Sequence, residues 1–190
     1  MKNTRFALFI LSALAAPMMV SGAATHDVAQ IDQSEHQVHG SGVSPTGLVE
    51  KVREATQPFR DLQAALDAHY EEFLGCVSGA QEGAMGIHFV NFGLVQDPEL
   101  RVDQPEALIY EPRDGQMRLV GVEYIVDVAA WHANPMNDKP PVLEGQVFQY
   151  NGSPNRYGLD PFYELHVWSS RENPNGAFAD WNPRVSCAGR

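Results

Sequence analysis

The stretch EALIYEPRDGQMRLVGVEYIVD, residues 106–127, decides the fold of this chain. Two runs rich in β-branched and aromatic residues flank the segment PRDG at 112–115. An Asp-Gly pair between two such runs is typical of the tight turn of a β-hairpin. The sequence therefore predicts two antiparallel strands, over 106–111 and 117–128.

Three further segments have the composition of strands. They span 85–92, 145–150 and 162–170, and segments rich in Pro, Gly, Asn and Asp separate them. No helical region long enough for a crossover lies between any two of these strands, which argues against a parallel sheet. We expect an antiparallel sheet of about five strands.

The segment before the strands has the period of an amphipathic helix. Its apolar face, at steps of three and four residues, comprises Leu48, Val52, Ala55, Phe59, Leu62, Leu66, His69 and Phe73. Pro58 interrupts this pattern and suits the first position of a second helix. We expect a short helix near 46–55 and a longer one from 58 to about 74, with Gly75 as its C-terminal cap and His69 at the edge of the core.

These elements indicate an α+β fold in one globular domain, residues 48–190. One or two N-terminal helices pack on a curved antiparallel sheet of about five strands. The alternative is a small antiparallel β-barrel, cupin-like or lipocalin-like, with an appended helix.

The N-terminus has the pattern of a secretory signal peptide. Lys2 and Arg5 precede the apolar run FALFILSALAAPMMV, and the small residues SGAAT follow it. We expect a signal peptide over 1–23, cleaved after Ala23, and a flexible mature N-terminus over 24–47. The apolar run is short for a transmembrane span. The mature protein is therefore expected in the periplasm or outside the cell, without a membrane anchor.

Composition limits the partners and the redox state. The chain has 190 residues and a net charge of −11, and a surplus of acidic groups argues against nucleic acid and anionic membranes as partners. Its two cysteines, Cys76 and Cys187, are expected to form a disulfide in an oxidising compartment. A thiolate pair for metal binding or catalysis is the alternative.

Titratable side chains at the strand centres are the candidate site. Alternate residues of a strand share a face, so Glu164, His166 and Trp168 lie together on one face of their strand. If His88, His166 and Glu123 (or Glu164) face one cavity, they suit a divalent metal ion such as Zn(II), Fe(II), Mn(II) or Cu(II). Without a metal, Glu123 and Glu164 are candidate catalytic acid–base groups.

Other interpretations of these residues stay open. The histidines and carboxylates are also consistent with structural polar groups, with Glu164 and Glu123 paired to arginines. The aromatic side chains Tyr124, Tyr163 and Trp168 either line a small-molecule pocket or belong to the core. No Gly-rich phosphate loop occurs, so no nucleotide cofactor is expected. No Gly-x-Ser-x-Gly motif occurs either, which argues against a serine hydrolase.

Four motifs carry a family resemblance: GCVSGAQEGAMGIHFVN, PEALIYEP, RLVGVEYIV and FYELHVWSSRENPNGAFADWNPRVSC. They resemble a group of small secreted bacterial proteins of uncharacterised function. The resemblance implies a folded domain from near Thr56 to Cys187 and supplies no reaction. It singles out the same positions, in MG-x-H, VEY and ELHVW, that strand chemistry selects.

The sequence predicts a secreted or periplasmic domain with a small-molecule pocket and a candidate divalent-metal site. A non-catalytic ligand-binding module and a structural or interaction protein are the alternatives. Whether the protein is an enzyme, which metal it binds and its oligomeric state are left open.

Overall fold

The predicted hairpin lies at the centre of the fold. In the computed structural model, which describes residues 45–189, β3 (Ala107–Arg113) pairs antiparallel with β4 (Gln116–Asp127). Asp114 and Gly115 connect the strands at φ values of 52° and 71°. A two-residue hairpin turn of type I′ requires positive φ at both central residues, and an Asp-Gly pair adopts this conformation readily.

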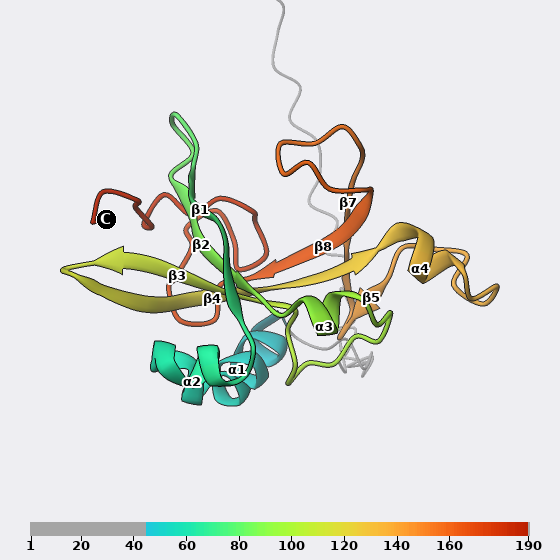
Figure 1. Ribbon diagram of the computed structural model, residues 1–190, viewed down its shortest axis with the longest axis horizontal. Helices are drawn as coiled ribbons and strands as arrows, with labels where there is room; N and C mark the ends of the chain where they lie inside the picture. The colour runs from blue at the N-terminus through green and yellow to red at the C-terminus, as the bar shows by residue number, and fades with distance from the viewer. Residues whose placement is uncertain (1–44, 190) are drawn as a thin grey trace, which may run out of the picture. The chain divides into compact units, whose positions relative to one another are not determined.

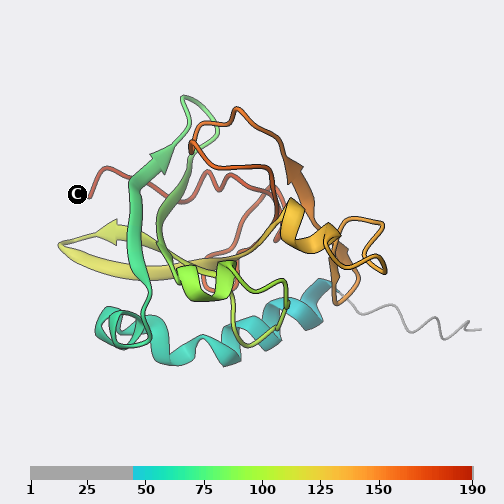
Figure 2. The ribbon, with the colours of Figure 1, turned by 45° about the vertical axis from the view of Figure 1, so that its right-hand side comes forward.

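A curled antiparallel sheet forms around this hairpin (Figures 1 and 2). It has six strands in the order β1-β2-β3-β4-β8-β7. The remaining four are β1 (Glu71–Ser78), β2 (Ala84–Val90), β7 (Gln149–Asn151) and β8 (Phe162–Val167), and a separate ribbon joins β5 (Val142–Leu143) to β6 (Gln146–Val147). The α+β prediction is confirmed, and because β1 and β7 do not pair, the described sheet is not the closed barrel of the alternative.

Helices cover one face of the sheet (Figure 1). The first helix, α1 (Pro45–Ala55), is followed by the 3-10 turn η1 (Gln57–Arg60) and by α2 (Leu62–Asp67). Leu48 and Val52 of α1 are fully buried in the main core, as the helical period predicts. Two short helices, α3 (Phe92–Val95) and α4 (Val128–His132), follow β2 and β4.

The prediction of a long helix up to residue 74 is wrong. The helix α2 ends at Asp67, and residues 71–78 form β1, which pairs with β2. His69 is exposed in the left-handed region at φ 66°, so it is not at the edge of the core. Gly75, at φ 69°, lies in a bulge of β1 and caps no helix. The predicted strand 145–150 is also divided, into β6 and β7.

The second face of the sheet is covered by irregular segments. Asn182 forms two backbone hydrogen bonds with Ala84 of β2, at 3.2 and 3.1 Å, which holds the C-terminal segment along this face. The predicted disulfide is confirmed: Cys76 of β1 is bonded to Cys187, with a Cα–Cα distance of 5.7 Å. The C-terminal segment is therefore fixed to the sheet at two points.

The predicted signal peptide and residues 24–44 of the predicted flexible segment lie outside the described residues. Residues 45–47, which that segment included, belong to α1. Within the range 45–189, no helix has the length and apolar character needed to cross a membrane.

Candidate metal centre

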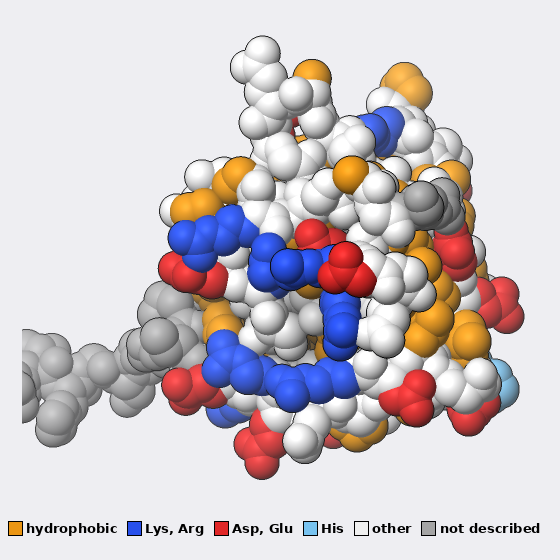
Figure 3. Space-filling model, turned by 90° about the vertical axis from the view of Figure 1, so that its left-hand side faces the viewer, with side chains coloured by type: hydrophobic (Ala, Val, Ile, Leu, Met, Phe, Trp, Pro, Cys, Tyr) orange, Lys and Arg blue, Asp and Glu red, His pale blue; other side chains and the backbone are white. Residues whose placement is uncertain are grey.

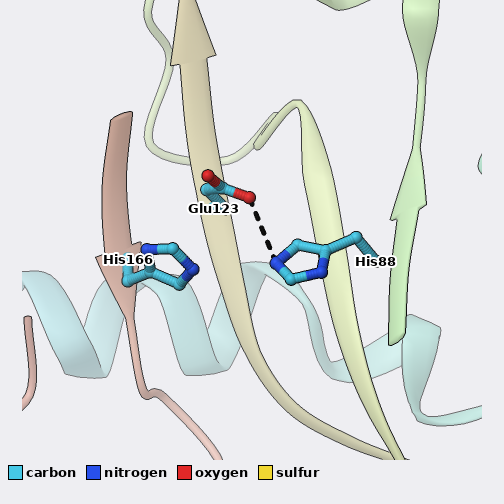
Figure 4. Close-up of side chains that lie close together, drawn as sticks. All are labelled: His88, Glu123 and His166. Atoms are coloured by element: carbon cyan, nitrogen blue, oxygen red, sulfur yellow. Dashed lines mark ion pairs between the residues drawn. The ribbon is translucent and has the colours of Figure 1, made fainter. Parts of the chain in front are cut away.

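The strand register brings His88, Glu123 and His166 together on the face opposite the helices. Glu123 of β4 lies directly opposite His166 of β8. The small residue Ala107 of β3 lies on the other side of Glu123. Figure 4 shows His88 of β2 reaching across β3 toward Glu123, with His166 on the far side. Three strands thus direct one polar group each into the same space.

The three side chains are close and buried. His88 Nε2 lies 3.2 Å from Glu123 Oε2, and the rings of His88 and His166 have centroids 5.9 Å apart. One ligand atom from each of the three residues lies within 4.8 Å of the other two. Donors at about 2.0–2.2 Å from one ion lie at most about 4.4 Å apart, so a small adjustment of the side chains lets the three atoms share one ion.

His166 differs from His88 in its hydrogen bonding. It is 1% exposed, and neither of its ring nitrogens has a hydrogen-bond partner among the described residues. Buried polar groups in native proteins are almost always hydrogen-bonded, because leaving one unpaired is costly. An imidazole in this position therefore points to a partner other than the side chains around it.

Two more carboxyl groups adjoin His166. Glu164, two residues earlier on β8, interacts with Glu123 through a hydrogen bond between the carboxyl groups. Asp180 Oδ1, from the C-terminal segment, lies 3.8 Å from His166 Nδ1 and accepts a hydrogen bond from Gln149 Nε2. Ligand atoms of Glu164, His166 and Asp180 also lie within 4.8 Å of one another.

Burial sets the protonation of the cluster. Burial lowers the pKa of His88 to about 4 and that of His166 to about 3, so both imidazoles are neutral at pH 7. Burial raises the pKa of Glu123 to about 7. The pKa of Glu164 is raised to about 9, first by burial and then by the neighbouring carboxyl group of Glu123. Neutral imidazole is the form that binds metal ions.

A small pocket adjoins the cluster. It has a volume of about 40 Å³, and its walls are His88, Glu123, Phe73, Leu74, Val77, Val90, Ile125, Tyr157, Leu159 and Phe162. A volume of this size holds a few water molecules. It is far below the roughly 300 Å³ at which sites for drug-sized molecules begin. The space directly beside the cluster therefore suits water or a very small ligand.

None of the three predicted aromatic residues is among the walls of this pocket. Tyr124 lies on the opposite, helix-covered face, where its hydroxyl donates to the carbonyl of Val102. Tyr163 lies on that face too, because strand alternation separates it from Glu164. Trp168 is on the face of the cluster and stacks on His166 at a centroid distance of 6.3 Å.

The alternative of arginine partners for the two glutamates is not realised. Within residues 45–189, neither Glu123 nor Glu164 forms an ion pair with an arginine, and Glu123 pairs with His88 instead. Sequence reasoning missed Asp180, because the segment that holds it has no periodic pattern. It also did not predict that Phe73 lines the pocket, because residue 73 was assigned to a helix.

No protein-family model, no curated protein and no solved structure matches this chain. The function therefore has to be inferred from the site, and the resemblance to small secreted bacterial proteins stays a prediction.

Proposed function

We propose that this domain binds one divalent transition-metal ion through His88, Glu123 and His166. The observation that carries the proposal is His166: it is buried, its ring nitrogens have no partner among the described residues, and it lies within ligand distance of two other donors. A bound ion supplies the missing partner. It also replaces the contact between His88 and Glu123 with two metal–ligand bonds.

The ligand set favours a metal with open coordination positions. Two imidazole nitrogens and one carboxylate are typical of Zn(II) and Fe(II) sites that keep room for water or substrate, and Mn(II) and Cu(II) accept the same donors. The pocket of about 40 Å³ meets the cluster at His88 and Glu123, so it provides that room. Such an ion supplies Lewis acidity or a metal-bound water for chemistry on a very small substrate.

Asp180 and Glu164 are proposed to orient the site. A carboxylate beside the second nitrogen of a metal-bound histidine fixes the ring and its tautomer. Asp180 is placed for this role, since its Oδ1 is near His166 Nδ1.

A metal-free acid–base site is the second candidate. Its supporting observation is the hydrogen bond between Glu123 and Glu164, whose raised pKa values leave one proton shared by the pair near neutral pH. In this alternative Glu164 is the proton donor and Glu123 the base.

We also propose that the domain acts outside the cytoplasm, in the periplasm or the medium. Its one disulfide supports this location, because disulfides persist mainly in oxidising compartments. The signal-peptide pattern of the sequence points the same way.

Titration of metal-free protein with Co(II), followed by visible absorption, tests the metal proposal. We expect saturation at one ion per chain and a spectrum with nitrogen ligands, lost in His88→Ala and His166→Ala. The matched control is His69→Asn, which removes an exposed histidine at positive φ and keeps a residue that tolerates this conformation. Folded protein without Co(II) binding would overturn the proposal and leave the acid–base pair as the better candidate.

A further inference from the structure

Arginines gather around one hollow of this acidic chain. The hollow has a volume of about 430 Å³, and the charged residues that line it are Arg60, Arg113, Arg118, Arg171, Glu111 and Asp114. Figure 3 shows Lys and Arg side chains collecting around a hollowed area on the face at the hairpin end of the sheet. Four arginines against two carboxylates is the reverse of the balance in the whole chain, which carries a net charge of −11.

Segments far apart in sequence build this hollow. Arg60 ends η1, Arg113 and Arg118 flank the hairpin turn, and Arg171 follows β8. Arg171 is held in place, since its Nε and Nη2 donate to the carbonyl of Arg184 at 3.1 and 2.8 Å. The buried side chains of Leu119 and Val120 also line the hollow. The fold, and not a local run of basic residues, creates the charge.

The positive charge in the hollow is incompletely neutralised. Among the described residues, Arg60 and Arg118 form no ion pair. Arg113 has one exposed contact with Asp114 at 3.8 Å, and exposed pairs of this kind contribute little.

Elsewhere among the described residues, arginines have partners of several kinds: Arg53 donates to the carbonyl of Ser169, and Arg156 lies over the ring of Trp181. Arg101 contacts Asp97 and Glu99, and Arg184 contacts Glu172. Glu111, which faces Arg118 across the hairpin, uses one carboxylate oxygen to accept the backbone N–H of Ser186 at 3.0 Å. What sets the hollow apart is that four arginines meet around one space and only two carboxyl groups accompany them.

We propose that this hollow, the arginine hollow, binds a small molecule that carries two separated carboxylate or phosphate groups. Guanidinium groups match the planar face of a carboxylate or phosphate with two parallel hydrogen bonds. Four arginines from three segments surround a space of about 430 Å³, a volume within the range of small-molecule sites. Such a space suits two anionic groups joined by a short linker. The arginine hollow shares no residue with the metal centre, so this proposal stands independently of it.

Isothermal titration calorimetry with glutarate and with glucose 1,6-bisphosphate tests the proposal and distinguishes the two chemistries. We expect one of these dianions to bind wild-type protein with a Kd below 1 mM, and acetate or glucose 1-phosphate to bind at least tenfold more weakly. Arg60→Ala and Arg118→Ala should each weaken the binding at least tenfold. His88→Ala should leave it unchanged, which excludes binding through the metal centre.

The charge-matched control is Lys139→Ala, because Lys139 is exposed and lies outside the arginine hollow. If Lys139→Ala weakens binding as much as Arg118→Ala, attraction is nonspecific and the proposal is wrong. The proposal is also wrong if neither dianion binds the protein. Binding to vesicles of anionic lipid without binding to either dianion would contradict it in the same way.

Discussion

The environment of His166 distinguishes two roles for this residue, that of a metal ligand and that of a core residue that only packs. Without metal, its two unpartnered ring nitrogens cost stability, typically about 1–3 kcal/mol for a buried unsatisfied group. We therefore expect His166→Leu to raise the free energy of unfolding of metal-free protein by about 1 kcal/mol, measured by urea denaturation in EDTA. If His166 were a structural histidine with hydrogen-bond partners, the His166→Leu substitution would instead lower the free energy of unfolding.

His88→Leu is the matched control for that change. It removes the partner at 3.2 Å from Glu123 and leaves a buried carboxyl group without it, so the free energy of unfolding should fall. Added Zn(II) should stabilise only the wild type, since only that protein has a complete site. Stabilisation of His166→Leu by the metal would contradict the assignment.

Glu106, which lies outside the candidate metal centre, gives the folded chain a pH-dependent stability. It is 1% exposed, burial raises its pKa from 4.5 to about 8, and its Oε2 accepts the N–H of Ile125. Between these two pH values the unfolded chain loses the proton while the folded chain keeps it. The free energy of unfolding should therefore fall as the pH rises from about 5 to 8.

Urea denaturation of Glu106→Gln between pH 5 and 8 measures this contribution. The variant has no proton to lose at this position, so its stability should decline less steeply than that of the wild type. Glu54→Gln, at an exposed site on α1, should keep the wild-type slope. Equal slopes for the wild type and Glu106→Gln would show that Glu106 does not hold its proton in the folded chain.

Single residues also show which parts of the candidate site can be predicted from the sequence. Strand alternation alone placed Glu164, His166 and Trp168 on one face, because the period of two is independent of the tertiary structure. It could not find Asp180, which enters the site from an irregular segment. The arginine hollow was equally inaccessible, since its four arginines meet only after folding.

At the scale of elements, the approach of β8 to β4 depends on Gly121. A Cβ atom there would lie 2.8 Å from the carbonyl oxygen of Val167, which is backbone and cannot move aside alone. Gly121→Ala should therefore separate the strands that hold Glu123 and His166. We expect a loss of about 1–3 kcal/mol in the free energy of unfolding and at least tenfold weaker Co(II) binding.

Gly152→Ala is the control for this prediction. The nearest atom to its Cβ position is a ring carbon of Tyr150 at 3.4 Å, which is an ordinary contact. Unchanged stability and metal affinity in Gly121→Ala would mean that the two strands tolerate separation.

The elements that the sequence misassigned have one physical cause. Leu66, His69 and Phe73 follow helical spacing, yet residues 71–78 form an edge strand paired only with β2. Hydrogen bonding to β2 overrides the helical spacing of these residues, and nothing in the sequence of this segment indicates that pairing. The hairpin at 106–127 was predictable because its turn residues are adjacent in sequence.

At the scale of the whole molecule, the disulfide fixes the C-terminal segment over the candidate metal centre. It closes a loop across a separation of 111 residues, for which the chain-entropy model gives a stabilisation of about 4–5 kcal/mol. The double variant Cys76→Ser with Cys187→Ser should lose about 3–5 kcal/mol in guanidinium unfolding. Its Co(II) affinity should also fall, because Asp180 belongs to the released segment. A reduced chain as stable as the oxidised one would show that the hydrogen bonds of Asn182 suffice.

The most direct test of the central claim is the metal content of the wild-type protein, purified without chelators and without affinity-tag histidines. Inductively coupled plasma mass spectrometry should find close to one transition-metal ion per chain, and almost none in folded His88→Ala or His166→Ala. A wild-type protein free of metal that also takes up no Zn(II), Fe(II), Mn(II) or Cu(II) on titration would contradict the account.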